Sequence, residues 1–305
     1  MKARNVFYSG SNPFPTSIFR KSMNKKKIII IHSKVSYGFV GLNTTALVLQ
    51  LSGFEVITIP TVLYSNHLGL ATIGGGAVPD DLFQDLLEGV LKLDLLNDVA
   101  AIVIGYIGTE TQVEMTADFV QKIKNSHPSL TYLCDPVMGD IDAGLYVNPN
   151  VSTSIEKLLL PLADMSTPNQ FEIQKILNTT TNSADEILDL IRSNALFSTQ
   201  KIVITGAKFK TTLHGTLDNC IVENGEMTII RNKEIPVQMA GTGELFAAHL
   251  LSFLLKGIHL NEAVLLSGDI LSNVLLRMFN NGRMDFNSED IIASLNILNL
   301  NSCSK

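Results

Sequence analysis

The heptapeptide AGTGELF at residues 240–246 runs without a break into the apolar segment 247–255 and sets the plan of the fold. An apolar surface on all sides predicts a helix buried at the centre of the molecule, with other elements packed around it. Gly241 and Gly243 allow a sharp turn and a close approach of the backbone to a ligand. The helix predicted to start there has unpaired N–H groups at the positive end of its dipole. We therefore expect an anion site at Gly241, Thr242 and Gly243.

Glu244 places a carboxylate beside this anion site. A negative side chain opposes anion binding, so its presence favours a role in accepting a proton. Phosphoryl transfer needs both features: donors that stabilise the charge on the phosphoryl oxygens, and a base for the attacking hydroxyl. The alternative interpretation is an ordinary helix start in which the two glycines relieve crowding. The rest of the chain must decide between the two.

Composition limits the classes of protein that this chain can belong to. Its 305 residues, 46% hydrophobic and 17% charged, can fill a sizeable core. A net charge of −6 argues against nucleic-acid partners and against an anionic membrane surface. The chain has an odd number of cysteines, and their spacing suggests no disulfide framework, which favours a reducing compartment (Cys134, Cys220 and Cys303). No apolar run reaches the roughly 20 residues of a membrane span, and no cleavable leader is visible, so we expect a cytoplasmic protein.

Helical and strand patterns alternate along the chain with short connections, which predicts parallel pairing and an α/β fold. Residues 1–26 are expected to be an irregular arm, either draped over the surface or partly disordered, and residues 27–305 a single domain. Residues 61–78, with three adjacent glycines at 74–76, are predicted to be a loop, either a hinge or flap or a simple connection. The expected strands are 27–31, 55–60, 99–104, 130–134 and 201–205, and the expected helices are 41–51, 79–96, 111–124, 183–197, 241–255, 260–280 and 290–298, with a hairpin at 211–231.

Polar side chains follow the predicted strands. Ser33, Tyr106, Asp135, Thr167 and Thr205 all stand at such positions. In an open parallel sheet, ligands bind outside the carboxyl ends of the strands. The agreement among these strand ends favours a real site over chance loop composition.

Carboxylates cluster after the predicted strand at 130–134. Asp135 opens the acidic segment 135–142, and Mg²⁺ shared with polyphosphate oxygens needs one or two such groups. An ordinary acidic turn with proline and glycine is the alternative. Farther along, Asn169 and Glu172 have the spacing of a capping box at a helix start, a role compatible with one in binding.

The pattern resembles the ribokinase-like superfamily of small-molecule kinases and, within it, the pyridoxal (pyridoxine, pyridoxamine) kinases. The likeness runs from about residue 28 to residue 279. Its fold, a three-layer α/β/α sandwich with a mostly parallel central sheet, is what the resemblance implies. The segments that carry the resemblance are 33–41 (SKVSYGFVG), 60–67 (PTVLYSNH), 105–108 (GYIG), 135–140 (DPVMGD), 167–172 (TPNQFE) and 241–243 (GTG).

The resemblance implies transfer of the ATP γ-phosphate to the 5′-hydroxyl of a vitamin B6 vitamer. It also implies Mg²⁺, stimulation by K⁺ or another monovalent cation, a homodimer, and a loop that closes over the substrate. The implied catalytic residues are Glu244, Gly241, Thr242 and Gly243; the substrate side would involve Ser33, Gly69, Tyr106 and Glu244, the ATP side Asp135, Thr167, Glu172, Thr205 and Thr242, and the metal Glu172, Tyr146 and Asp135.

Two positions depart from the family pattern. The family has Asp as its base where this chain has Glu244, and the extra methylene moves the carboxylate by about 1.5 Å. Glu has similar basicity, so the chemistry is retained in principle. Gly69 has no side chain where the family contacts the pyridine ring. Two alternatives therefore stay open: a weakly active or inactive relative that binds a B6 vitamer or pyridoxal phosphate, and a kinase for another hydroxymethyl heterocycle such as hydroxymethylpyrimidine.

Overall fold

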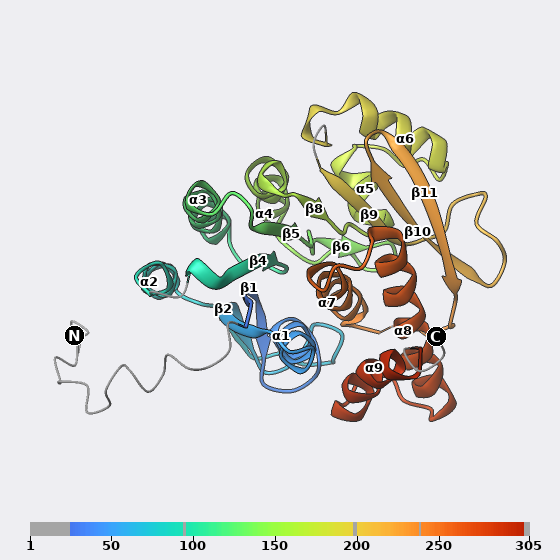
Figure 1. Cartoon of the computed structure of the whole chain (residues 1–305), viewed down its shortest axis with the longest axis horizontal. Helices are drawn as coiled ribbons and strands as arrows, with labels where there is room; N and C mark the ends of the chain where they lie inside the picture. Colours follow the sequence, from blue (N-terminus) through green and yellow to red (C-terminus); the bar gives the residue numbers. More distant parts are fainter. Residues whose placement is uncertain (1–24, 94–95, 198–199, 238, 302–305) are drawn as a thin grey trace.

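A central sheet organises the computed structural model, which describes residues 25–93, 96–197, 200–237 and 239–301. The described residues form a nine-stranded sheet in the order β11-β10-β9-β8-β5-β4-β1-β2-β3 (Figure 1). The strands of this sheet are β1 (Lys27–Val35), β2 (Glu55–Tyr64), β3 (Gly75–Ala77), β4 (Val99–Ile104), β5 (Thr131–Cys134), β8 (Met165–Ser166), β9 (Lys201–Ala207), β10 (Thr216–Glu223) and β11 (Glu226–Lys233).

Strands β2, β1, β4, β5, β8 and β9 pair in parallel, and β3, β10 and β11 add antiparallel edges. A separate two-stranded ribbon joins β6 (Gly139–Asp140) to β7 (Gly144–Leu145). Because the central strands are parallel, their carboxyl ends meet at one edge of the sheet.

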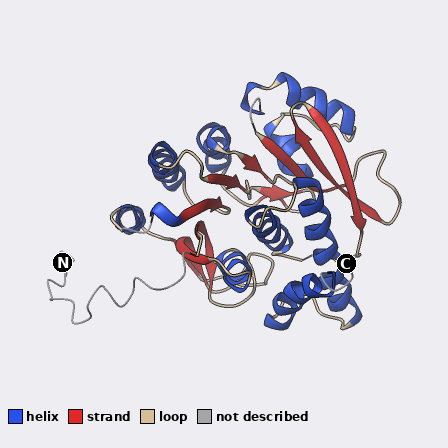
Figure 2. Ribbon diagram, viewed as in Figure 1, coloured by secondary structure: helices blue, strands red, loops and turns tan. Residues whose placement is uncertain are grey.

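Helices cover both faces of the sheet (Figure 2). One layer packs α1, α7, α8 and α9 against the sheet, and the other packs α2 to α6. Their bounds are α1 (Leu42–Leu51), α2 (Asp80–Leu91), α3 (Glu110–Ser126), α4 (Pro149–Ser154), α5 (Gln170–Ile176), α6 (Ala184–Ser193), α7 (Thr242–Leu255), α8 (Leu260–Asn280) and α9 (Ser288–Asn301).

The four consecutive isoleucines of β1 show why the sheet needs two helical layers. Ile28 and Ile30 belong to the core beneath α1, α7 and α8. Ile29 and Ile31 belong to the core beneath α2 and α3. All four are fully buried. A strand buried on both faces is continuously apolar, as predicted for residues 27–31. The three-layer α/β/α fold that the family resemblance implied is confirmed.

The glycine-rich stretch was predicted wrongly. Strand β2 continues through Pro60 to Tyr64, and Gly75–Ala77 pairs with it as the antiparallel edge strand β3. Gly75 has φ +106°, and a Cβ there would lie 2.0 Å from the Leu63 carbonyl oxygen. The glycines therefore permit a close edge pairing that the absence of alternating side chains concealed.

Several local expectations can be compared with the structure. Helix α3 is capped by Thr109, whose hydroxyl accepts from the Gln112 N–H, rather than by the predicted cap at Thr111. The hairpin around Asn224 and Gly225 is confirmed. Most of the expected arm, residues 1–24, lies outside the described residues, so its order stays a prediction. Within the described chain, no helix is long and apolar enough to cross a membrane.

Truncation of the buried Ile30 side chain tests the double-sided core. We expect Ile30→Ala to lower the free energy of unfolding by about 2–5 kcal/mol, because it removes buried methyl groups and leaves a cavity. Leu51→Ala, at a half-exposed position of α1, is the control and should change it by less than about 0.5 kcal/mol. Urea unfolding of both variants measures the difference, and equal effects would contradict the assignment.

Candidate active site

The predicted strand-end residues lie along one edge of the sheet. Ser33 is near the end of β1, Asp135 and Thr167 directly follow β5 and β8, and Thr205 is in the last part of β9. Backbone bonds continue the ladder past these ends, from Asp135 N–H to the Ile104 carbonyl (2.8 Å) and from Thr167 N–H to that of Cys134 (3.1 Å). The strand ends are thus held in register beside one another.

The start of α7 lies against this edge. Gly241 has φ +92° and caps the helix in the left-handed conformation. A Cβ at Gly241 would lie 2.4 Å from the Phe39 carbonyl oxygen, so only glycine fits between these backbones. A Cβ at Gly243 would be 3.9 Å from Asp135 Oδ2, which puts the first turn of α7 next to that carboxylate. The unpaired N–H groups at this helix start can bind an anion.

Glu244 is half-buried, in the first turn of α7. Its Oε1 accepts a hydrogen bond from the Gly41 N–H at 3.2 Å. Gly41 is the N-cap of α1, so the carboxylate lies at the starts of two helices, where positive dipole ends stabilise negative charge. Its negative charge adds to the effect of burial in raising the pKa of Asp135, and it opposes the larger effect of burial, which lowers the pKa of His32. Glu244 therefore lies near both groups.

His32 was overlooked in the sequence. Its imidazole is buried, and Nδ1 accepts the Ser33 N–H at 2.8 Å and lies 3.2 Å from Ser33 Oγ. Nε2 has no hydrogen-bond partner in the described part of the chain. Burial lowers the pKa of His32, against the opposing effect of Glu244. The sequence feature that could have identified it is a histidine directly after a run of isoleucines. A polar side chain buried in an apolar strand requires hydrogen-bond partners, which indicates a specific role.

Asp135 and Glu172 form a buried acidic pair. Burial first, and then Glu244, raises the pKa of Asp135 to about 8, and the neighbouring Thr167 hydroxyl acts in the opposite direction. Burial and then Asp135 raise the pKa of Glu172 well above its ordinary value. Two carboxyl groups so placed favour retaining a proton or binding a cation.

Asp135 and Glu172 differ in how their carboxylate oxygens are used. Glu172 accepts the Met138 N–H (2.9 Å) through Oε1 and the Asn169 N–H (2.8 Å) through Oε2, and it completes the predicted capping box. Its oxygens therefore shape the turn after β5. Asp135 has a carboxylate beside the start of α7 and fits the needs of Mg²⁺, which takes one or two carboxylates together with phosphate oxygens. No cluster of three or more acidic, His or Cys ligands occurs among the described residues.

The remaining predicted residues each have separate partners. Tyr106 is half-buried, and burial followed by Tyr64 raises its pKa to about 12. The Thr205 N–H donates to the Pro168 carbonyl at 2.9 Å. Tyr146 is bonded through its hydroxyl to Asp140 and closes the β6–β7 ribbon. Gly69 is exposed, and its N–H donates to His67 Nδ1 at 3.2 Å.

Comparison with known proteins gives consistent results. The model of the phosphomethylpyrimidine kinase family matches residues 44–288. The pyridoxine/pyridoxal/pyridoxamine kinase of Bordetella avium is 31% identical over 81% of this chain and 84% of its own. The pyridoxal kinase of Entamoeba histolytica has a TM-score of 0.81 at 26% identity, covering 90% of this chain and 95% of that one. That of Leishmania donovani, solved with ADP and pyridoxamine, has a TM-score of 0.75 at 27% identity over 87% and 92%.

The fold and the site together define a small-molecule kinase of the ribokinase-like fold. The chain belongs to the phosphomethylpyrimidine kinase family and, within it, to the pyridoxal kinases. It is therefore a kinase, as the predicted resemblance implied.

The raised pKa of Asp135 predicts how stability depends on pH. Between 3.8 and about 8 the folded chain retains a proton on Asp135 that the unfolded chain has lost. The unfolded state then binds fewer protons, so this group lowers the free energy of unfolding as pH rises through that window. We expect Asp135→Asn to lack this contribution. Its stability relative to the parent should increase from acid to pH 8, as measured by urea unfolding without ligand. A pH-independent difference would contradict the buried acidic pair.

Proposed function

We propose that this chain transfers the γ-phosphoryl group of ATP to the 5′-hydroxyl of pyridoxal, pyridoxine or pyridoxamine, with Glu244 as the general base. The observation that carries the proposal is the position of the Glu244 carboxylate. It accepts the Gly41 N–H at the start of α1 and stands in the first turn of α7, whose N–H groups suit an anion. A base beside an anion site is the combination that phosphoryl transfer to an alcohol requires.

On the nucleotide side, the backbone at Gly241, Thr242 and Gly243 takes up charge that develops on the transferred group. These donors are held in place before the reaction begins. Stabilisation of the developing charge is most effective when the donors are preorganised in this way. Asp135, Thr167 and Thr205 border the same edge of the sheet and bind the nucleotide.

The proposed metal site is built on the acidic pair of Asp135 and Glu172. Mg²⁺ neutralises phosphate charge when bound, and Asp135 is the side chain that fits it. Glu172 acts behind Asp135 through the turn that it fixes, and Tyr146 acts through Asp140. K⁺ or another monovalent cation stimulates the reaction, as it does in the family that the motifs resemble.

On the acceptor side, Ser33 and Tyr106 bind the ring, and the Glu244 carboxylate receives the proton of its hydroxymethyl group. Neutral His32 holds Ser33 by accepting its N–H, which fixes the strand end that carries the hydroxyl. Gly69 borders this side without a side chain of its own. The enzyme works as a homodimer in the cytoplasm, two features inferred from the motifs and composition.

A second candidate is phosphorylation of a hydroxymethylpyrimidine. The description of the matching family model and the missing side chain at Gly69 support it. Coupled ATP consumption with pyridoxal, pyridoxine, pyridoxamine and hydroxymethylpyrimidine, with and without Mg²⁺, separates the two. Highest kcat/KM with a B6 vitamer supports the first proposal. Tight binding of pyridoxal phosphate without ATP consumption on any alcohol would instead show a catalytically silent binding protein.

Substitution of Glu244 tests its role as the base. Glu244→Gln retains an oxygen that can accept the Gly41 N–H but removes the basicity, so kcat should fall by about 10²- to 10⁴-fold. ATP affinity should change little, because the amide pocket is unaltered. Glu262→Gln, in the exposed first turn of α8, is the matched control and should leave kcat unchanged.

The shorter acid provides a further test of the same position. If the additional methylene displaces the carboxylate from its best position, Glu244→Asp should have a higher kcat than the parent, since attack geometry tolerates little displacement. Steady-state kinetics at saturating substrate measures this difference. A kcat for Glu244→Gln equal to that of the parent would remove Glu244 from the mechanism.

A further inference from the structure

The turn between α8 and α9, residues 281–287, contacts two parts of the site. Phe286 is buried, and its ring lies against Gly241 at the start of α7, where a Cβ would be 3.3 Å from the ring. The preceding residue, Asp285, places Oδ1 3.0 Å from His67 Nε2. His67 belongs to the loop that follows β2, residues 65–74. The 281–287 turn therefore joins the start of α7 to the loop that contains Gly69.

His67 connects three segments of the chain. Its Nδ1 accepts the Gly69 N–H at 3.2 Å, so the neutral ring carries its proton on Nε2 and donates it to Asp285. The ring also lies against Gly38, where a Cβ would be 3.5 Å from Cδ2. The His67 side chain is only 12% exposed, which favours a fixed orientation. Gly38 belongs to the segment that leads from Ser33 to Gly41.

The 65–74 loop is held together by hydrogen bonds between its own residues. Ser65 and Gly74 close its base, with the Ser65 N–H donating to the Gly74 carbonyl (2.8 Å) and the Gly74 N–H to Ser65 Oγ (2.9 Å). Across its middle, Asn66 Nδ2 donates to the Thr72 carbonyl at 2.7 Å. Outside the loop, the Tyr37 N–H donates to the Ser65 carbonyl at 2.9 Å, and the His67–Asp285 bond adds a second tie.

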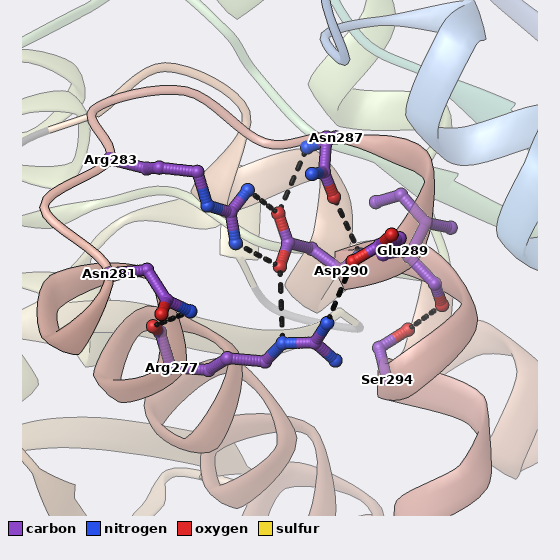
Figure 3. A network of polar contacts seen from close by, with 8 residues as sticks. Arg277, Asn281, Arg283, Asn287, Glu289, Asp290 and Ser294 are labelled. Atoms are coloured by element: carbon purple, nitrogen blue, oxygen red, sulfur yellow. Dashed lines mark hydrogen bonds and ion pairs between the residues drawn. The ribbon is translucent and has the colours of Figure 1, made fainter.

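The 281–287 turn, which carries Asp285, is anchored by an ion network around the buried Asp290 (Figure 3). Asp290 is fully buried and accepts two hydrogen bonds from Arg283, at 2.6 and 2.7 Å, and one from the Asn287 N–H at 2.9 Å. Arg277 Nε lies 3.9 Å from the same carboxylate. Burial acts to raise the pKa of Asp290, but the bonds from Arg283 and Asn287 outweigh it and lower the pKa. Bidentate pairing of this type is rigid, so the 281–287 turn has a firm base.

We propose that His67 and Asp285 are positioning residues that set the distance between the acceptor alcohol and the anion pocket. Their hydrogen bond ties the 65–74 loop to the turn that packs on Gly241. The loop borders the acceptor side, and Gly241 borders the phosphate side. This inference rests on the proposed function, since it assigns the alcohol to the side of Ser33 and Gly69.

Two variants of Asp285 separate positioning from simple loss of charge. Asp285→Leu removes the acceptor for the His67 N–H, and we expect KM for the acceptor alcohol to rise by up to about tenfold, the effect of one net hydrogen bond. KM for ATP should stay within about twofold of the parent, because this bond lies on the acceptor side. Asp285→Asn keeps a neutral oxygen acceptor and should behave like the parent. Met284→Ala, an exposed neighbour in the same turn, is the control.

A measurement without substrate keeps this test independent of the proposed activity. Amide hydrogen exchange in residues 65–74 should be faster in Asp285→Leu and unchanged in Asp285→Asn and Met284→Ala. His67→Phe combined with Asp285→Leu should exchange no faster than either single variant, because both remove the same bond. Unchanged exchange in Asp285→Leu overturns the inference. Altered exchange in a chain that phosphorylates no alcohol would uphold the tie between the segments and reject the proposed function alone.

Discussion

The hydrogen bond from the Gly41 N–H to Glu244 is the contact on which the site depends. It brings the starts of α1 and α7 together, so both helix dipoles act on one carboxylate. Gly41 achieves this at φ +55° with its α-carbon against Ser33 Oγ, where a Cβ would lie at 2.3 Å. Any side chain at Gly41 would separate the Ser33 strand end from α7. A single backbone position thus links the strand end at Ser33 to Glu244, the proposed base.

Negative charge is concentrated around this contact at the expense of stability. Asp135 and Glu172 are buried together, and Glu244 acts on Asp135 from α7. Such an arrangement disfavours the ionised state of the unliganded protein. The magnesium ion that we propose to bind at Asp135 would relieve this repulsion through its positive charge.

The sequence predicted what depends on local pattern. The isoleucine run of β1 and the apolar stretch of α7 determined the layers, and the rule for parallel sheets placed Ser33, Asp135 and Thr167 at one edge. The glycines of β3 were misjudged because pairing by a strand almost without side chains has no periodicity.

The overlooked contacts are of a different kind. Gly41 and Glu244 are 203 residues apart, and His67 and Asp285 are 218 residues apart. No spacing rule connects positions at such separations, because the connection exists only after the sheet and both helical layers have formed. His32 was overlooked for a related reason: its bonds to Ser33 are local, but its burial beside Gly105 is tertiary.

These separations also matter while the protein is being made. Residues 33–41 and 65–74 leave the ribosome long before their partners at 244 and 285, since synthesis proceeds from the amino terminus. Until then the Gly41 N–H lacks its partner Glu244, and His67 Nε2 lacks its partner Asp285. Closure of such distant pairs is entropically slow. The nascent chain therefore carries an unfinished site through most of translation, and its last helices complete it.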